Sequence, residues 1–204
     1  DLACHLGTLS AILLIFSQRI RDLFTTDYAT LKRVAIGTLP LFPLVLLLKP
    51  IKAVYADPSF LGFFFLATAA ILFLGTRAKT PAPSTIHNPP SLSDAFKIGL
   101  WQAAAILPGI SRSGSTITGA RLLGWQTSDA ITFSFLLAIP AILGGTTLEL
   151  YKLWSQPDST LSLPLSHYFA GFTVSFAVGL ASLKLLTLGA VQNKFSCFAW
   201  YCLF

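Results

Sequence analysis

Methionine is absent from this chain, glutamate occurs only at Glu149, and charged residues make up only 11% of its 204 residues. Because translation starts with methionine, we expect Asp1 to lie downstream of the native N-terminus of the protein. The other end, from Phe195 to Phe204, stops inside an apolar run that is too short to span a bilayer. The sequence therefore predicts a fragment that is truncated at both ends.

The scarcity of charge excludes a typical soluble globular domain. Hydrophobic residues make up 54% of the chain and its mean hydropathy is +0.71, as in integral membrane proteins. Since short loops join the apolar segments, we predict that residues 1–204 form a single integral membrane domain. The expected fold is all-α and polytopic, with about six spanning segments of ~20 residues each. The predicted spans are 2–16, 34–48, 59–75, 130–150 and 167–188, with a partial one from 195.

The net charge of +6 does not indicate a nucleic-acid partner, because the basic residues flank apolar segments instead of clustering. Loops 17–33 and 76–97 are rich in lysine and arginine, whereas loop 151–166 holds only Lys152. The positive-inside rule therefore places the first two loops in the cytoplasm. Within the second loop, residues 78–93 are rich in proline and serine and are predicted to be an extended linker.

Cysteine and histidine are too few and too scattered to form a ligand set or a catalytic pair. The residues concerned are Cys4, Cys197, Cys202, His5, His87 and His167. We predict no metal site in this part of the protein and no catalytic role for these histidines.

Residues 94–124 differ from the predicted spans. Asp94 to Leu107 is apolar for barely a dozen residues, Pro108-Gly109 then breaks the helix, and Ser111 to Leu123 is again short. Two half-length helices around a polar break indicate a re-entrant or discontinuous element. The alternative is one tilted and kinked helix that crosses the membrane.

The second half-helix begins with Ser111-Arg112-Ser113-Gly114-Ser115-Thr116. Hydroxyl side chains at a helix start usually cap it, and capping alone would explain the serines and the threonine. Capping does not need Arg112, however, and an arginine inside a membrane costs roughly 2.5–3.5 kcal/mol even on the more lenient scale. A guanidinium beside free backbone N–H groups is suited to a phosphate. Gly109 and Gly114 would let the backbone approach that ligand closely.

Three further side chains near the break are polar or amphipathic. Gln102, on the first half-helix, is predicted to bond the break or a ligand, and Trp101 beside it could equally be an interfacial anchor. Arg121 lies half a helical turn round from Arg112 and is expected to face another surface, such as lipid headgroups.

The run QAAAILPGISRSGSTITGARLLG, followed by FSFLLAIPAILGGTTLELYK, resembles the undecaprenyl-pyrophosphate phosphatase family, which is also known for bacitracin resistance. The start, HLGTLSAILLIFSQRIRDL, is similar to the segment that follows the first motif of that family. The resemblance extends over essentially the whole chain, and a PGxSRSGxT signature within a polytopic protein is specific.

This resemblance implies a multi-pass enzyme of the bacterial inner membrane. It would hydrolyse undecaprenyl pyrophosphate to the monophosphate, which recycles the lipid carrier for peptidoglycan synthesis. It also implies an interlocked inverted repeat with two re-entrant elements. The implied catalytic residues are Ser111, Arg112, Ser113 and Thr116, and the substrate-binding residues are Arg112, Gly109, Gly114, Ser115 and Gln102.

The chain departs from the family pattern in one respect. The first motif of the family carries two glutamates four apart and a serine-rich turn that ends in a histidine. These groups are taken to supply metal binding, the nucleophile and the acid-base function, and no counterpart occurs here. We therefore expect a divalent cation, Mg or Ca, whose ligands lie outside residues 1–204. We also expect this fragment to be inactive by itself.

Two other functions fit the same pattern. A polyprenyl-phosphate transporter or flippase would also use broken helices and an anion site at mid-membrane depth. In a non-catalytic membrane scaffold, the cluster of serine and arginine would only cap a helix. The expected partners are a polyprenyl pyrophosphate lipid and the bilayer, and a homo-oligomer is left open.

Overall fold

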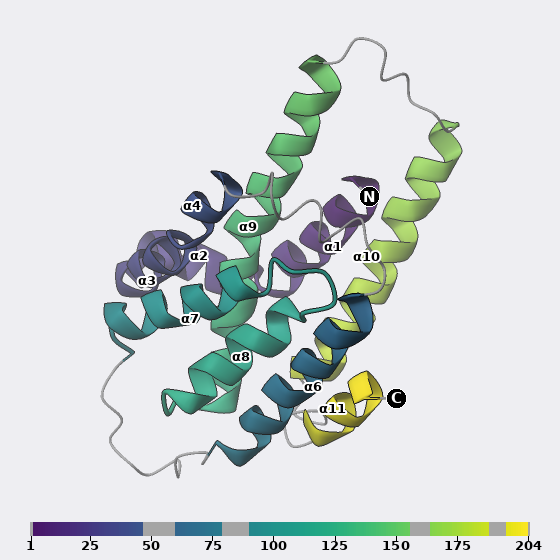
Figure 1. The fold of residues 1–204 in the computed structure, drawn as a ribbon. Coiled ribbons are helices and arrows are strands. Elements are labelled where there is room, and N and C mark those ends of the chain that lie inside the picture. The colour runs from purple at the N-terminus through teal and green to yellow at the C-terminus, as the bar shows by residue number, and fades with distance from the viewer. Residues whose placement is uncertain (1, 47–59, 79–89, 156–163, 188–194, 204) are drawn as a thin grey trace.

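The computed structural model describes residues 2–46, 60–78, 90–155, 164–187 and 195–203 (Figure 1). Every regular element in these ranges is a helix, so the predicted all-α class is confirmed for them. In chain order the helices are α1 (Leu2–Ile15), α2 (Ser17–Thr25), α3 (Tyr28–Thr38), α4 (Leu41–Leu46), α6 (Leu61–Arg77), α7 (Leu92–Ala104), α8 (Arg112–Leu122), α9 (Thr127–Ser155), α10 (Leu165–Thr187) and α11 (Phe195–Leu203).

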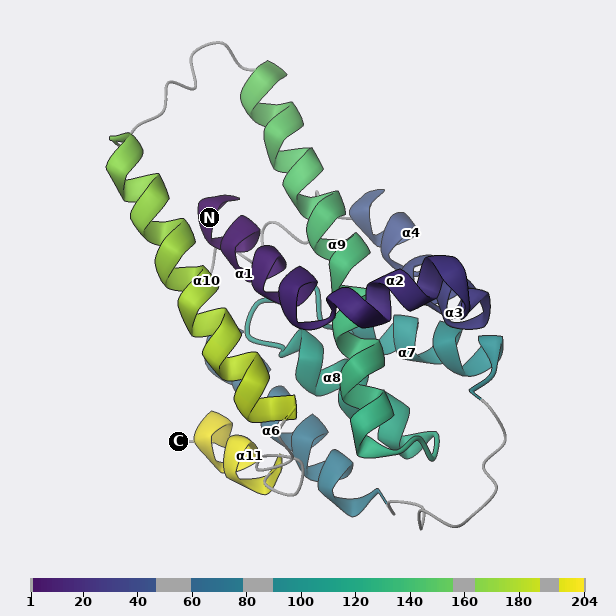
Figure 2. The same ribbon diagram turned by 180° about the vertical axis from the view of Figure 1, so that it is seen from behind.

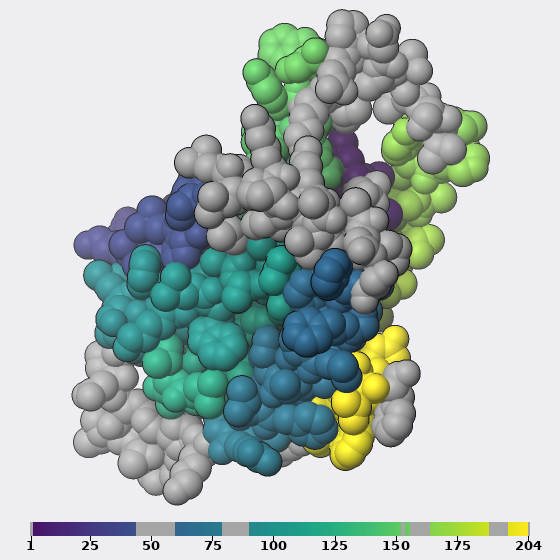
Figure 3. All heavy atoms as spheres, in the orientation of Figure 1, coloured from purple at the N-terminus to yellow at the C-terminus, as the bar shows by residue number. Residues whose placement is uncertain are grey.

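The long helix α9 runs through the middle of the molecule, and the other helices pack around its first half (Figures 1 and 2). On one side α1 packs against both α9 and α10. On the other side α7 lies between α3 and α8, and α8 in turn contacts α6 and α9. The helices α6, α7 and α8 thus form one continuous face, which Figure 3 shows from outside. The predicted site lies at the junction of α7 and α8 on this face.

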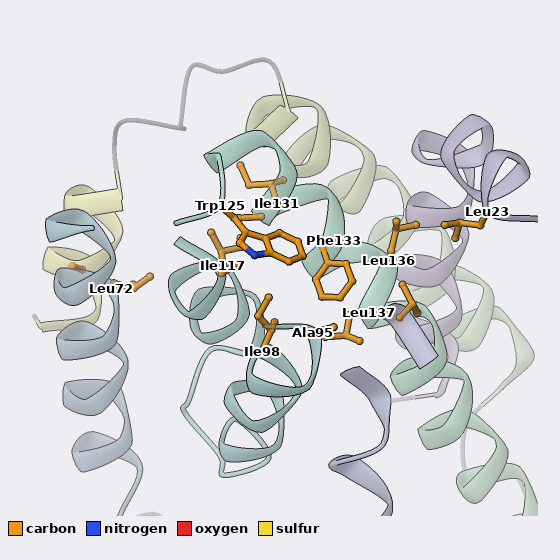
Figure 4. Packing of buried hydrophobic residues seen from close by; sticks show 14 residues of the cluster. Leu23, Leu72, Ala95, Ile98, Ile117, Trp125, Ile131, Phe133, Leu136 and Leu137 are labelled. Atoms are coloured by element: carbon orange, nitrogen blue, oxygen red, sulfur yellow. The ribbon is translucent and has the colours of Figure 1, made fainter. Parts of the chain in front are cut away.

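The largest cluster of buried apolar side chains joins α7, α8 and α9 (Figure 4). Ile98 of α7 and Ile117 of α8 are almost fully buried, and they lie beside Trp125 at the end of the α8–α9 connection. The ring of Trp125 packs against Phe133 of α9, with ring centroids 5.0 Å apart. This core fixes the position of the α7–α8 pair relative to α9.

Glycine allows α3 and α7 to cross at close range. A Cβ atom on Gly99 of α7 would fall on the backbone of Gly37 in α3, with the carbonyl oxygen of Gly37 as its nearest contact. A Cβ atom on Gly37 would lie 2.9 Å from Leu137 Cδ1 and 3.1 Å from the carbonyl oxygen of Ala95. The two backbones are therefore in direct contact, an arrangement that only small residues permit.

Among the described residues, two helices are long and apolar enough to cross a membrane, over Thr127–Tyr151 and Leu165–Thr187. The pair α1 and α2 passes the same test when taken together but is bent by 69°, and α6 is a shorter apolar helix. Large apolar side chains are exposed along these helices, among them Phe63, which is 67% exposed, and Phe169, which is 72% exposed. Such exposure is unusual in water but is expected of lipid-facing helices. The two candidate spans correspond to the predicted spans 130–150 and 167–188, whereas the predicted span 59–75 corresponds to the shorter helix α6.

The prediction of one span over 34–48 was wrong for the described part. The helix α3 already begins at Tyr28, after the cap residue Asp27, and it ends at Thr38. A new helix starts at Leu41, directly after Pro40, which has no N–H group to continue the hydrogen-bonding ladder of α3. The predicted span at about 2–16 corresponds to α1, which ends at Ile15, where the chain bends into α2.

Some predictions fall on residues outside the described ranges. These are the central part of the linker 78–93, one end of each of the spans 34–48, 59–75 and 167–188, the last residue of the partial span from 195, and His87.

Candidate anion-binding site at the break between two helices

The helices α7 and α8 form a hairpin, as the interpretation of two half-length helices predicts. Ser91 and Asp94 cap the start of α7 reciprocally: Ser91 Oγ accepts from the Asp94 N–H at 3.0 Å, and Asp94 Oδ2 accepts from the Ser91 N–H at 3.1 Å. After the break, α8 turns back along α7, and a Cβ atom on Gly119 would lie 2.5 Å from Trp101 Cδ1. A single kinked helix that continues in one direction is therefore excluded.

The break itself lies between Ala104, the last residue of α7, and Arg112, the first of α8. Gly109 has a φ of 89°, a left-handed conformation that side chains disfavour. A Cβ atom at this position would also lie 3.0 Å from Phe64 Cβ and 3.2 Å from Leu61 Cδ1 of α6. Gly109 is thus required both by its backbone conformation and by the close approach of α6.

The first turn of α8 bonds some of its N–H groups internally and leaves others free. Ser111 is the N-cap: its Oγ accepts from the Gly114 N–H at 3.1 Å, and its carbonyl oxygen accepts from the Ser115 N–H at 2.9 Å. The N–H of Ser111 itself donates to the side chain of Thr68. Among the described residues, no acceptor is left for the N–H groups of Arg112 and Ser113. These two donors lie at the positive end of the helix dipole.

The side chains of the same turn fall into two groups. The guanidinium of Arg112 and the exposed hydroxyl of Ser113 bond to no other described residue. Ser115 and Thr116 are each only 1% exposed. Ser115 Oγ donates to the Ser111 carbonyl at 2.8 Å, and Thr116 Oγ1 is 2.9 Å from the Arg112 carbonyl and 2.6 Å from Ser134 Oγ.

The predicted set of site residues is thus divided by the fold. Arg112, Ser113 and two free N–H groups face outward from the start of α8, where they can meet a ligand. Ser111, Ser115 and Thr116 hold the turn together. Gly114 is buried, and a Cβ atom there would lie 3.0 Å from Ser111 Oγ and 3.1 Å from Leu72 Cδ2. Gly114 therefore leaves room for the side chains of Ser111 and Leu72.

Gln102 lies in the buried face of α7 and is only 1% exposed. Neither its amide nitrogen nor its amide oxygen has a hydrogen-bond partner, and so Gln102 does not bond the break. An unpaired buried amide costs about 1–3 kcal/mol per polar group. Gln102 therefore remains available to a polar group that reaches this depth.

Arg121, near the end of α8, points away from Arg112 as predicted, but it is only 9% exposed. One of its terminal nitrogens lies 3.5 Å from the carbonyl oxygen of Ala78, at the end of α6. The expectation that Arg121 faces lipid headgroups was therefore wrong, because this side chain is buried against the α6 terminus.

Two residues of the site were missed by the sequence analysis. Thr68 of α6 bonds both sides of the break, and Ser134 of α9 bonds Thr116. Each is a single hydroxyl residue in an otherwise apolar helix, far from the signature in sequence. Burial of a hydroxyl within a predicted span is the only signal that could have marked them, and it is shared by many threonines that bond their own helix.

The donor set at the break does not fit a divalent cation. Such ions prefer carboxylate oxygens, whereas the turn offers a guanidinium, N–H groups and hydroxyls. In the part of the chain that the structure describes, no group of His, Cys, Asp or Glu side chains is arranged to hold a metal ion. The chemistry of the turn is that of an anion site.

Two pockets in the described part lie elsewhere. One, of about 170 Å³, is lined by residues of α2, α3 and α9, including Asp22, Asp27 and Arg33. The other is a groove between α7 and α8, lined by Trp101 and Gly119 among others. Neither includes a residue of the Ser111–Thr116 turn. The free donors of the turn therefore lie outside both of these pockets.

These features define an all-helical protein with helices apolar enough to cross a membrane and a break between two antiparallel half-length helices. The chain belongs to the family of the bacitracin resistance protein BacA, whose family model matches residues 1–204. Membership in this family and the apolar helices together make it a membrane protein.

Three relatives carry the same name, undecaprenyl-diphosphatase. The protein of Protochlamydia amoebophila is 49% identical over 205 residues, which cover 100% of this chain and 78% of the relative. That of Rhodopirellula baltica is 39% identical over 204 residues, again covering 100% and 78%. That of Methanococcus vannielii is 32% identical over 206 residues, covering 97% and 78%.

Proposed function

We propose that this protein hydrolyses undecaprenyl pyrophosphate to undecaprenyl phosphate and inorganic phosphate. The observation that carries the proposal is the start of α8, where a guanidinium and two N–H groups have no partner among the described residues. A pyrophosphate supplies the negative charge and the acceptor oxygens that such a group of donors requires. The name shared by the relatives, undecaprenyl-diphosphatase, supports this choice of phosphate ligand.

In this mechanism the terminal phosphoryl group lies against the first turn of α8. A nucleophile that is expected outside residues 1–204 attacks the terminal phosphorus, the bridging P–O bond breaks, and the bridging oxygen leaves with the lipid monophosphate. The whole reaction consumes one water, whose oxygen ends on inorganic phosphate and whose protons pass to phosphate oxygens or to solvent. Negative charge on the transferring group and the leaving oxygen is neutralised by Arg112 and by the N–H groups of Arg112 and Ser113. Donors that are fixed before the reaction stabilise such a charge without reorganisation, which is usually the largest contribution to catalysis.

The other predicted residues have supporting roles in this proposal. Ser113 supplies a free hydroxyl to the ligand, whereas Ser111, Ser115 and Thr116 hold the turn. Gly109 and Gly114 let the backbone approach the ligand closely. Gln102 is the polar group that a more deeply buried part of the ligand would meet. A divalent cation is a further prediction, and its ligands are expected outside residues 1–204.

We further propose a multi-pass protein of the bacterial inner membrane, with an interlocked inverted repeat, that recycles the lipid carrier for peptidoglycan synthesis and so confers bacitracin resistance. The basic loops 17–33 and 76–97 support a cytoplasmic side for both. A homo-oligomer remains a prediction.

The test is phosphate release from undecaprenyl pyrophosphate by the purified complete gene product in detergent, with and without Mg or Ca. The variant Arg112→Ala should lower the rate by about 10²–10³-fold, as does the loss of one fixed donor to a developing anion. Arg121→Ala is the matched control, because this arginine lies in the same helix but bonds the end of α6. Equal rates for Arg112→Ala and the unmodified protein would contradict the role of Arg112. Transbilayer movement of the lipid without phosphate release would favour a flippase.

A further inference from the structure

One hydroxyl group joins the two sides of the helix break. Thr68 Oγ1 donates to the carbonyl oxygen of Gly109 at 2.7 Å and accepts from the N–H of Ser111 at 3.1 Å. A hydroxyl has one proton to donate and lone pairs to accept, so both bonds can form at once. Thr68 is only 2% exposed, and water therefore does not compete for these bonds.

Close contacts with α8 and with Gly109 fix the position of α6, the helix that carries Thr68, relative to the break. A Cβ atom on Gly75 of α6 would lie 2.6 Å from Thr118 Oγ1 of α8, and Leu72 Cδ2 lies close to Gly114. At the other end of the contact, Phe64 and Leu61 approach Gly109. Because α6 touches α8 and the break at several points on both sides of Thr68, the backbone of Thr68 cannot shift relative to the break without moving the whole helix.

The bond to the Ser111 N–H has a direct effect on the free donors. Ser111 is the N-cap of α8, and its orientation determines where the next two N–H groups point. Thr68 occupies the Ser111 N–H, while Ser111 Oγ occupies the Gly114 N–H. Arg112 and Ser113 are then left as the residues whose N–H groups are free.

We propose that Thr68 is a positioning residue for the anion-binding turn. It does not touch the substrate, and it acts by holding Gly109 and Ser111 so that the donors of Arg112 and Ser113 keep one direction. This inference rests on the proposed phosphatase function for its effect on the rate, whereas the hold on the break can be measured without substrate.

The test compares Thr68→Val, which keeps the shape but removes the hydroxyl, with Thr68→Ser, which keeps the hydroxyl. The matched control is Thr76→Val in the same helix, because Thr76 is exposed and its hydroxyl bonds only the Phe73 carbonyl at 2.7 Å. Thr68→Val should lower kcat for phosphate release by about 10–100-fold, since small misplacements of positioned groups have effects of this size. Thr68→Ser should stay within about threefold of the unmodified protein, because it keeps the bonds from which the effect is derived. Thr76→Val should not change kcat.

A double variant separates positioning from a general loss of structure. If Thr68 acts through the turn, Thr68→Val should lower kcat much less in an Arg112→Lys background than in the unmodified protein. If Thr68→Val instead caused a structural defect elsewhere, the losses in kcat of Thr68→Val and Arg112→Lys would multiply in the double variant. Full multiplication, or an unchanged kcat in Thr68→Val, would overturn the proposal.

Amide hydrogen exchange of the peptide around Ser111 tests the hold on the break directly. Exchange at Ser111 should become faster in Thr68→Val, return to the original rate in Thr68→Ser and stay unchanged in Thr76→Val. Unchanged exchange in Thr68→Val overturns the inference even if phosphate is released. If the unmodified protein releases no phosphate but exchange responds as expected, the proposed function fails while the hold on the break stands.

Discussion

A single residue, Ser111, determines which backbone N–H groups at the start of α8 remain free. Ser111 accepts from Gly114 through its hydroxyl and from Ser115 through its carbonyl, and it donates its own N–H to Thr68. Each of these bonds removes one polar group from competition for a ligand. The N–H groups of Arg112 and Ser113 therefore stay free because capping uses the others. The same turn can thus be capped and bind an anion.

Asp27, the N-cap of α3, gives a prediction on pH. Its Oδ1 accepts from the Thr30 N–H at 3.0 Å. Hydrogen bonding from Thr30, together with the charges of Arg33 and Arg19, holds the pKa of Asp27 below its usual range, although desolvation opposes this shift. Because the pKa in the folded state is lowered, the stabilisation is complete above the unfolded-state pKa of about 4 and is lost as pH falls through the folded-state pKa.

The melting temperature in detergent should therefore fall between about pH 5 and pH 3 by more in the unmodified protein than in Asp27→Asn. Asparagine can still cap the helix but does not titrate, which makes it the matched control. Asp27→Ala should lower the stability at pH 7 by about 1 kcal/mol, because it removes the cap. Identical pH profiles for the unmodified protein and Asp27→Asn would contradict this assignment.

At this scale the sequence predicted residue types better than their directions. The serines, the threonine and the arginine after Pro108 indicated a polar helix start, and the structure has that start at Arg112. Which hydroxyls face outward depends on α6 and α9, because Thr116 is turned toward Ser134. Such a contact joins residues that are distant in the chain, and no local pattern encodes it.

At the scale of helices, proline had opposite effects at two positions. Pro40 separates α3 from α4, whereas α9 continues through Pro140 from Thr127 to Ser155. The residue is the same, and the difference lies in its surroundings. Pro140 lies well inside α9, whereas Pro40 follows the end of α3. The presence of a proline therefore does not by itself determine whether a helix ends.

The crossing of α3 and α7 gives a prediction on stability. In Gly99→Ala the added methyl group would meet the backbone of Gly37, which cannot move aside as a side chain could. We expect a loss of about 1–3 kcal/mol, the usual cost of overpacking, measured as a lower melting temperature in detergent.

Gly144→Ala in α9 is the matched control for that variant. Nothing lies within 4 Å of a Cβ atom at Gly144, and alanine has a higher helix propensity than glycine. Its melting temperature should stay the same or rise slightly. If Gly99→Ala and Gly144→Ala melt at the same temperature, the two backbones do not touch as closely as the structure has them.

At the scale of the whole molecule, the α7–α8 hairpin determines on which side of a membrane its ends lie. Lys97 of α7 and Leu122 of α8 line the same groove, so the start of α7 and the end of α8 lie at the same end of the hairpin. The helix α9 then starts close to that end and is long enough to cross a membrane. The two ends of the hairpin should therefore reach water on the same side, the cytoplasmic one by the positive-inside rule.

Cysteine labelling in oriented vesicles tests this arrangement. Single cysteines at Ser93, before most of α7, and at Ser128, after α8, are placed in a background without the native cysteines; both positions are exposed. An impermeant maleimide should reach both from the cytoplasmic side. A third cysteine at Ser155, which is exposed at the far end of α9, should react only from the opposite side. Labelling of Ser93 and Ser128 from opposite sides would mean that this element crosses the membrane, and the donors of Arg112 would then lie on a crossing path instead of in a re-entrant hairpin.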